Sequence, residues 1–112
     1  MSQKLTLLHD EEMIAVSFYE DKVQLSFHDY EIHVFAKLFV KTHALFIHPH
    51  HEGWRDALCE QINQKVVSTR SDEDDVEIVF ENKMALFVSR RAKDRDQKFN
   101  YAIHLEILDV CF

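Results

Sequence analysis

Gly53-Trp54-Arg55-Asp56-Ala57-Leu58-Cys59-Glu60-Gln61-Ile62-Asn63 is the stretch around which the rest of the chain is organised. Positions at i, i+3, i+4, i+7 and i+8 share one face of a helix. In this stretch they are Trp54, Ala57, Leu58, Gln61 and Ile62. The spacing predicts a short helix with one apolar face, which needs a sheet to pack on because three turns are not stable alone. Trp54 is predicted to be a core anchor, and Asn63 to close the helix in a left-handed conformation.

The chain on both sides of this helix alternates apolar and polar residues, as half-buried strands do. The predicted strands are Ile14–Phe18, Val23–Phe27, Ile32–Val40, Ala44–Ile47, Val66–Ser68, Val76–Phe80, Met84–Val88 and Tyr101–Ile107. Residues 4–8 form a short strand or a lead-in. Together these segments predict an α+β fold, with two antiparallel β-meanders of about seven or eight strands joined by one central helix. Residues 1–112 are interpreted as a single domain.

Three local features refine this prediction. The Ile32–Val40 segment is long for one strand, so we expect it to bend near Lys37. Glu81-Asn82-Lys83 is a tight hairpin turn in which Asn82 can accept a positive φ. Val23-Gln24-Leu25-Ser26-Phe27-His28-Asp29 and Val76-Glu77-Ile78-Val79-Phe80-Glu81-Asn82 share one pattern. This match leaves two interpretations open: an internal duplication, or two hairpins that bury the same face.

Charge and composition restrict the classes of function and partner that the chain can have. The chain has 112 residues and a net charge of -7, which argues against nucleic-acid binding and favours a basic protein partner. No stretch has the length of a membrane span, and the N-terminus lacks a signal-peptide pattern, so we expect a cytoplasmic protein that does not contact membranes. Cys59 and Cys111 do not make a disulfide framework. Cys59 borders the apolar helix face, where thiols are usually buried and inert.

Three blocks carry a resemblance to a known family: Asp21–Phe27, Trp54–Cys59 with Ile62 and Val66 beyond it, and Val76–Asn82. The chain resembles a family of small uncharacterised bacterial proteins, in which a Val-Gln-Leu-x-Phe strand, an aromatic-Arg-Asp-Ala-Leu-Cys helix and a Phe-Asp/Glu-Asp/Asn-Gly hairpin occur in this order. The similarity runs from about residue 13 to about residue 90, and it implies no reaction. Lys83 stands where that family tends to have glycine. In size, acidity and strand content the chain is also similar to immunity proteins of bacterial toxin systems, including contact-dependent growth inhibition.

Eight histidines raise the question of a catalytic or metal site. His48, His50 and His51 with Glu52 offer metal ligands, but their spacing does not fit a closed zinc site, and a solvated loop is the simpler interpretation. His28, His33, His104 and Glu106 are candidates for an acid/base face on the sheet, against the alternative of a polar outer face. With one glycine the chain has no phosphate-binding loop. We therefore predict no catalytic residues, no metal and no cofactor.

Two acidic runs remain as candidate partner-binding residues. They are Asp72, Glu73, Asp74 and Asp75, and secondly Asp10, Glu11 and Glu12. Residues 90–98 hold five basic and two acidic side chains, which leaves 8 basic against 18 acidic in the rest of the chain. A solvated turn explains such runs equally well, but a dense acidic turn can also cap the basic site of a nuclease. The prediction is an acidic, non-enzymatic inhibitor, an immunity protein for a cognate basic toxin. The alternatives are a small ligand-binding or hydrolytic domain using the His/Glu face, and a homo-oligomer, such as a homodimer, with a purely structural role.

Overall fold

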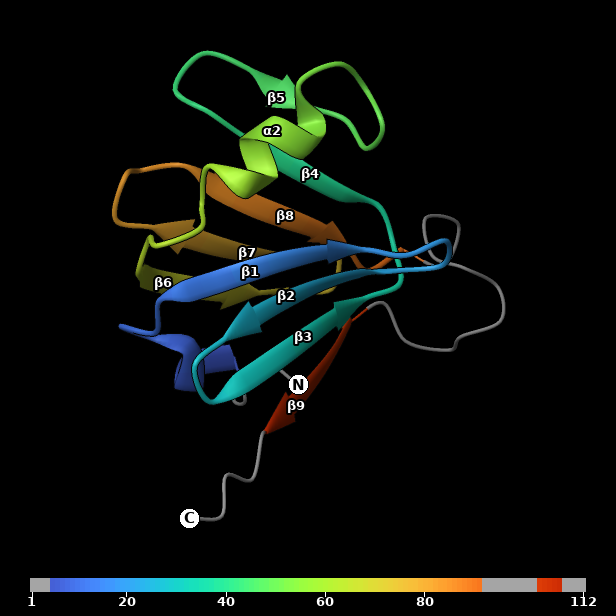
Figure 1. Ribbon diagram of the computed structural model, residues 1–112. Helices are drawn as coiled ribbons and strands as arrows, with labels where there is room; N and C mark the ends of the chain where they lie inside the picture. The colour runs from blue at the N-terminus through green and yellow to red at the C-terminus, as the bar shows by residue number, and fades with distance from the viewer. Residues whose placement is uncertain (1–4, 92–102, 108–112) are drawn as a thin grey trace.

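The computed structural model of the protein describes residues 5–91 and 103–107, the last five as backbone of a strand only. The strands of this part form two antiparallel sheets with one short α-helix beside them (Figure 1). Its elements are η1 (Thr6–Leu8), β1 (Met13–Phe18), β2 (Val23–Phe27), β3 (Tyr30–Val34), β4 (Leu38–Lys41), β5 (Phe46–Ile47), α2 (Trp54–Cys59), β6 (Val66–Ser71), β7 (Asp75–Phe80), β8 (Ala85–Ser89) and β9 (Ile103–Ile107). The predicted α+β class, with mostly β content, is confirmed.

Both predicted meanders are present, and each is extended by strands from elsewhere in the chain. The first sheet has the order β1-β2-β3-β9, and the second has the order β5-β4-β8-β7-β6. The two segments that share a sequence pattern contain β2 and β7, which are the middle strands of the β1-β2-β3 and β6-β7-β8 meanders. No helix in residues 5–91 is long and apolar enough to cross a membrane.

The core lies between the sheets and is made by alternate residues of the facing strands. Leu25 and Phe27 contribute from the first sheet, and Ile78, Phe80 and Leu86 from the second. These side chains belong to one continuous cluster of buried residues. The period-two pattern therefore predicted the buried face of β2, β7 and β8, because each of these strands has one face on the core.

The segment predicted as one long strand over residues 32–40 is two strands, and the break between them includes Lys37, where a bend was expected. β3 ends at Val34 in the first sheet and β4 begins at Leu38 in the second. The three residues between them cross from one sheet to the other, and Ser89 N donates to Lys37 O at 3.0 Å across this corner. Val34 and Leu38 are both buried, so the apolar alternation continues through the crossover and hides it.

The helix has the predicted face but ends early. α2 stops at Cys59, and turns carry the chain to Asn63, whose φ of 75° confirms the expected left-handed position. Trp54 is only 2% exposed, as predicted, and its Nε1 donates to Leu38 O at 2.8 Å. Gln61 is also fully buried, and its Nε2 donates to Ala57 O at 3.0 Å. The prediction for Cys59 is wrong, since its thiol is exposed.

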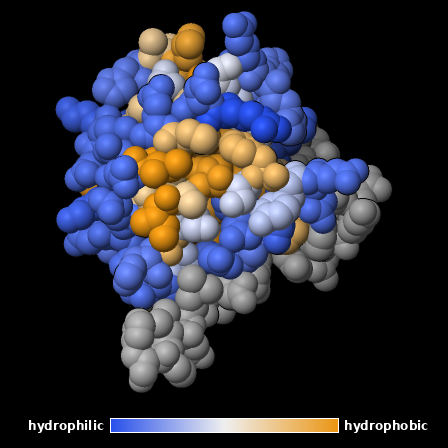
Figure 2. Space-filling model, in the orientation of Figure 1, coloured by the Kyte–Doolittle hydropathy of each residue, from blue (hydrophilic) through white to orange (hydrophobic). Residues whose placement is uncertain are grey.

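The start of the chain departs from the predicted strands at two points. Thr6–Leu8 is a turn of 3₁₀ helix, which excludes the short strand and leaves the lead-in of the two alternatives for residues 4–8. In β1, Ile14 is 49% exposed, because the pairing with β2 shifts between Met13 and Ala15. Such a bulge breaks the alternation that the sequence pattern assumes. Figure 2 shows an apolar surface over β1, bordered by hydrophilic side chains.

The β7–β8 hairpin places a lysine where glycine is favoured. Lys83 N donates to Phe80 O and Phe80 N donates to Met84 O, both at 2.9 Å. This is a three-residue loop with a left-handed residue at its end. Lys83, with a φ of 72°, takes the positive φ that was predicted for Asn82, while Asn82 Oδ1 accepts from Met84 N at 3.1 Å.

Replacing Lys83 by glycine should therefore stabilise the protein. The left-handed conformation costs a residue with a Cβ about 1–2 kcal/mol, and glycine avoids this cost. Glycine in turn loses about 0.5–1 kcal/mol on folding, because its unfolded chain has more conformational entropy. We expect the free energy of unfolding of Lys83→Gly to rise by about 0.5–1 kcal/mol in urea denaturation. Lys83→Ala removes the same side chain but keeps the Cβ. Equal stabilities of the two variants would show that backbone strain is not the cause.

Candidate functional site

The first candidate run, Asp72–Asp75, forms the turn between β6 and β7. Asp72 Oδ1 accepts hydrogen bonds from the backbone N–H groups of Asp74 at 2.8 Å and Asp75 at 3.0 Å. Asp72 N in turn donates to Asp75 O at 3.0 Å. An aspartate side chain that bonds the backbone two and three residues ahead is a standard way to fix a turn without glycine. The run therefore has a structural role whatever it binds.

Arg70, on β6, binds three of the neighbouring carboxylates. Its guanidinium contacts Asp72, and it donates to Asp75 Oδ1 at 2.9 Å and to Glu77 Oε1 at 3.2 Å. The register of β6 and β7 places Arg70 directly opposite Glu77. The hydrogen bonds that Arg70 donates to Asp75 and then to Glu77 raise the pKa of Arg70 above its ordinary value. The single positive charge of Arg70 is shared among these three carboxylates, so only part of the negative charge predicted for this turn is balanced by it.

The pKa of Asp72 is lowered, first by the backbone N–H groups of Asp75 and Asp74, and then by the charge of Arg70. A lowered carboxyl pKa adds stability that is complete above the ordinary value of about 4 and is lost as the pH falls through the folded-state value. We expect a carboxyl-detected NMR titration to give Asp72 a midpoint below that of a free aspartate. In Arg70→Gln the midpoint should rise only part of the way, because the backbone donors remain. A complete return would contradict the backbone cause.

Two arginines at the end of β8 also reach this turn. Arg90 Nη1 donates to Ser71 Oγ at 3.0 Å and to Asp72 O at 2.7 Å. Arg91 Nε lies 3.8 Å from Asp74 Oδ1, a looser ion pair. Glu73 is exposed and makes no ion pair with the rest of residues 5–91. Glu73 and Asp74 are therefore the carboxylates most open to a partner, and the remainder of the basic stretch, 92–98, lies outside the described residues.

The second run, Asp10–Glu12, lies at the opposite end of β6. Asp10 N donates to Val66 O at 2.8 Å, and Val66 N donates to Glu11 O at 2.9 Å. β6 runs from Val66 to Ser71, and six strand residues span about 17 Å. The structure therefore does not bring the two predicted acidic runs together in one patch.

An aromatic cluster that the sequence analysis missed lies beside the acidic turn. Phe39 and Phe87 are directly opposite each other on β4 and β8, on the face of the second sheet turned away from the core. Phe46, which is 49% exposed, stacks on Phe39 with ring centroids 5.2 Å apart and lies 5.7 Å from Phe87. The sequence did contain an indication of this cluster, since Phe39 and Phe87 are aromatic residues at the positions that the alternation assigns to the outer face of their strands.

A pocket of about 200 Å³ lies between the acidic turn and the aromatic cluster and is lined by residues of both. We call it the aromatic–acidic pocket. Its walls include Phe39, Phe46 and Phe87, together with Asp74, Asp75 and Arg91. Exposed aromatic rings next to carboxylates are typical of surfaces that bind cationic groups.

No known protein family, curated protein or solved structure matches the sequence. The resemblance to the small bacterial family and to immunity proteins stays a prediction.

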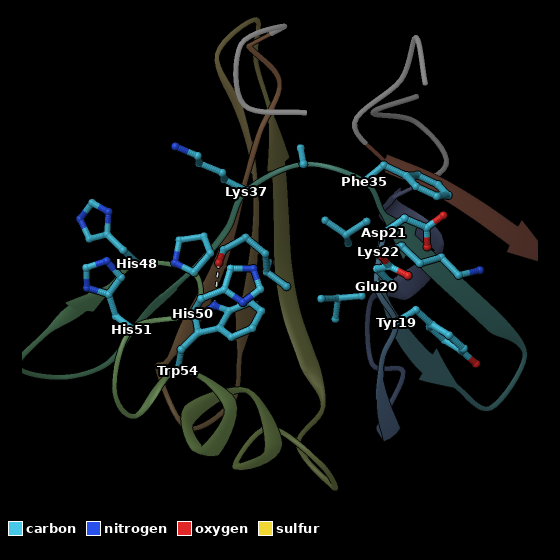
Figure 3. A pocket seen from close by; sticks show the side chains of 15 residues that line it. Tyr19, Glu20, Asp21, Lys22, Phe35, Lys37, His48, His50, His51 and Trp54 are labelled. Carbon is cyan, nitrogen blue, oxygen red and sulfur yellow. Dashed lines mark hydrogen bonds between the residues drawn. The ribbon is translucent and has the colours of Figure 1, made fainter. Parts of the chain in front are cut away.

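A larger cleft of about 340 Å³ lies between the β1–β2 hairpin, the crossover from β3 to β4, and the loop before α2. Figure 3 shows His50 and Trp54 together on one wall, and Tyr19 and Glu20 on the other. The rings of His50 and Trp54 are 4.8 Å apart, and His50 has a φ of 65°. Among the described residues no three His, Cys, Asp or Glu side chains are arranged to hold a metal ion, and His48, His50, His51 and Glu52 are not brought together in that way. We call this the histidine cleft.

The candidate acid/base face is brought together only in part. His33 lies opposite His104 in the register of β3 and β9, and the same register places Glu31 opposite Glu106. His33 Nε2 is 3.5 Å from Glu31, and Lys22 Nζ donates to His33 Nδ1 at 3.0 Å. His28 is in the β2–β3 turn, with 85% of its side chain exposed, and does not join this row. Neither the histidine cleft nor the aromatic–acidic pocket includes His28 or His33.

Proposed function

We propose that the protein works by binding, without turnover, and that it docks a basic protein on the outer face of its second sheet. The observation that carries this is that Asp74 and Asp75 of the acidic turn and the exposed Phe46 line one pocket. Buried aromatic anchors supply most of the binding energy in protein interfaces, and surrounding charges steer the encounter. The net charge of -7 favours a basic partner in the same way.

We further propose that the partner is a cognate bacterial toxin, nuclease-like in its positive charge, and that the protein is its immunity protein. The acidic turn then occupies positions where the toxin would hold phosphates. The acidity of the chain supports this proposal, and so do the exposed carboxylates of Glu73 and Asp74. This function requires neither a cofactor nor a metal.

The test is calorimetric titration against the product of the neighbouring gene, combined with a toxicity assay. We expect a one-to-one complex that abolishes the toxin activity and weakens as salt is raised from 50 to 300 mM, roughly the range over which exposed charges become screened. Absence of a complex, or an affinity independent of salt, contradicts the proposal. Light scattering on the free protein tests separately whether it forms a homodimer.

The histidine cleft supports a second candidate function, the binding of a small ligand. Its volume of about 340 Å³ is within the range of small-molecule sites, and Trp54, the only tryptophan in the chain, reports on it. A ligand in the cleft should change the tryptophan fluorescence in the native protein and not in His50→Ala. A fragment screen that leaves the fluorescence unchanged would remove this alternative.

A further inference from the structure

The aromatic–acidic pocket has an apolar wall and a charged end. Phe39, Phe46 and Phe87 form the wall, with the rings of Phe39 and Phe46 stacked at 5.2 Å. Asp74 and Asp75 come from the acidic turn and line the same pocket. A group that fills it therefore needs an apolar stem and a positively charged tip.

The size of the pocket restricts the occupant to one side chain. About 200 Å³ is below the range of sites for drug-sized ligands, but it suits the methylene stem and cationic head of arginine or lysine. A purely apolar side chain would remove water from the carboxylates without replacing their hydrogen bonds. An acidic side chain would face the carboxylates of Asp74 and Asp75, and Arg91 is, among the described residues, the one cation of the pocket that opposes their repulsion.

The chain itself places one guanidinium, that of Arg91, beside a carboxylate of this pocket. Arg91 lines the pocket with its Nε 3.8 Å from Asp74 Oδ1, longer than a hydrogen bond, and its side chain is 57% exposed. Asp75 uses Oδ1 for Arg70, and a carboxylate can accept from further donors through its second oxygen. A guanidinium is thus already held loosely at this site, and acceptor capacity remains for another.

We propose that the aromatic–acidic pocket receives an arginine or lysine side chain of the partner protein, an inference that rests on the proposed binding function and specifies its central contact. The stem packs on Phe46 and Phe87, and the cation is bound by Asp74 and Asp75. Charge-assisted hydrogen bonds to the carboxylates fix its orientation.

The test is an NMR titration of the isotope-labelled protein with the peptide Ac-Gly-Gly-Arg-Gly-Gly-NH₂ and with the same peptide carrying citrulline, the neutral isostere of arginine. We expect the arginine peptide to shift the signals of Phe39, Phe46, Phe87 and Asp75, and to bind about fivefold more tightly than the citrulline peptide. Phe46→Ala and Asp74→Asn should each weaken the arginine peptide by about threefold or more. Equal shifts from the two peptides, or shifts located elsewhere, overturn the inference.

Two control variants match these changes away from the pocket. Ile14→Ala truncates an apolar side chain that is 49% exposed, like Phe46, and Glu60→Gln removes one exposed negative charge, as Asp74→Asn does. Neither should alter peptide binding. If the neighbouring gene product binds Phe46→Ala and Asp74→Asn with unchanged affinity, the pocket assignment is wrong while the binding function stands. If the peptide binds in the pocket but the gene product forms no complex, the proposed function fails and the pocket assignment stands.

Discussion

Replacing Trp54 by alanine should lower the free energy of unfolding by about 3–5 kcal/mol, the range for large aromatic residues removed from a core. The side chain is 2% exposed, and its ring meets Phe18 of β1 edge-on with centroids 5.7 Å apart. Its Nε1 donates to Leu38 O of β4 at 2.8 Å. One residue of α2 therefore packs on the first sheet and hydrogen-bonds to the second, so its loss affects both.

Trp54→Phe separates the contribution of ring packing from that of the Nε1 hydrogen bond. It keeps most of the apolar volume but leaves the buried carbonyl of Leu38 without the indole donor, which costs about 1–3 kcal/mol. Urea denaturation should be followed by circular dichroism, because both variants lose the fluorophore. Glu60→Ala, an exposed change just after the same helix, should stay within about 0.5 kcal/mol of the native protein. A loss of less than 1 kcal/mol in Trp54→Ala would mean that α2 is not anchored in this way.

The parts of the fold that could be predicted from the sequence are those where a strand has one face on the core. Leu25 and Phe27, like Ile78 and Phe80, are buried at alternate positions, and local periodicity is sufficient to identify them. The crossover between β3 and β4 has the same periodicity, since Val34 and Leu38 are both buried although they belong to different sheets. Periodicity reports which face is buried but carries no information on the sheet to which that face belongs.

Predictions failed where backbone geometry overrides the type of residue. The bulge in β1 exposes Ile14, which the alternation assigned to the apolar face. In the β7–β8 hairpin, the loop needs its left-handed residue at the third position, so Lys83 adopts a positive φ although Asn82 has the greater intrinsic tolerance. Both outcomes depend on strand pairing, which no local pattern specifies.

The candidate site was only partly predictable, because strand pairing also determines which of its residues come together. The acidic run was visible in the sequence as a turn, but the strand register decides which of its charges stay open, because Arg70 and Arg91 reach it from β6 and from the end of β8. The aromatic cluster joins Phe39, Phe46 and Phe87 from three strands. Bringing residues about 40 positions apart into contact requires the pairing of β4 with β8, which lies beyond the reach of local periodicity.

The double replacement Asp74→Lys with Phe46→Ala should reduce the affinity for the basic partner by about a hundredfold at 50 mM salt. Each truncated anchor or reversed charge at the centre of an interface costs on the order of 1.4 kcal/mol or more, which is tenfold in affinity. Asp74 is the better choice for reversal than Asp75, because Asp75 pairs with Arg70 at 2.9 Å and its reversal would disturb the turn itself. Calorimetric titration gives the affinity, and thermal unfolding confirms that the variant is folded.

The matched experiment is Glu12→Lys, which reverses one exposed charge at the far end of β6. Because about 17 Å of strand separates it from the acidic turn, and exposed charges at that distance are screened by salt, its effect on affinity should stay below about threefold. The comparison decides between the two acidic runs that the sequence offered. If Glu12→Lys weakens the complex more than the double replacement does, the partner docks at the Asp10–Glu12 end of β6. The aromatic cluster then belongs to a surface with a different role.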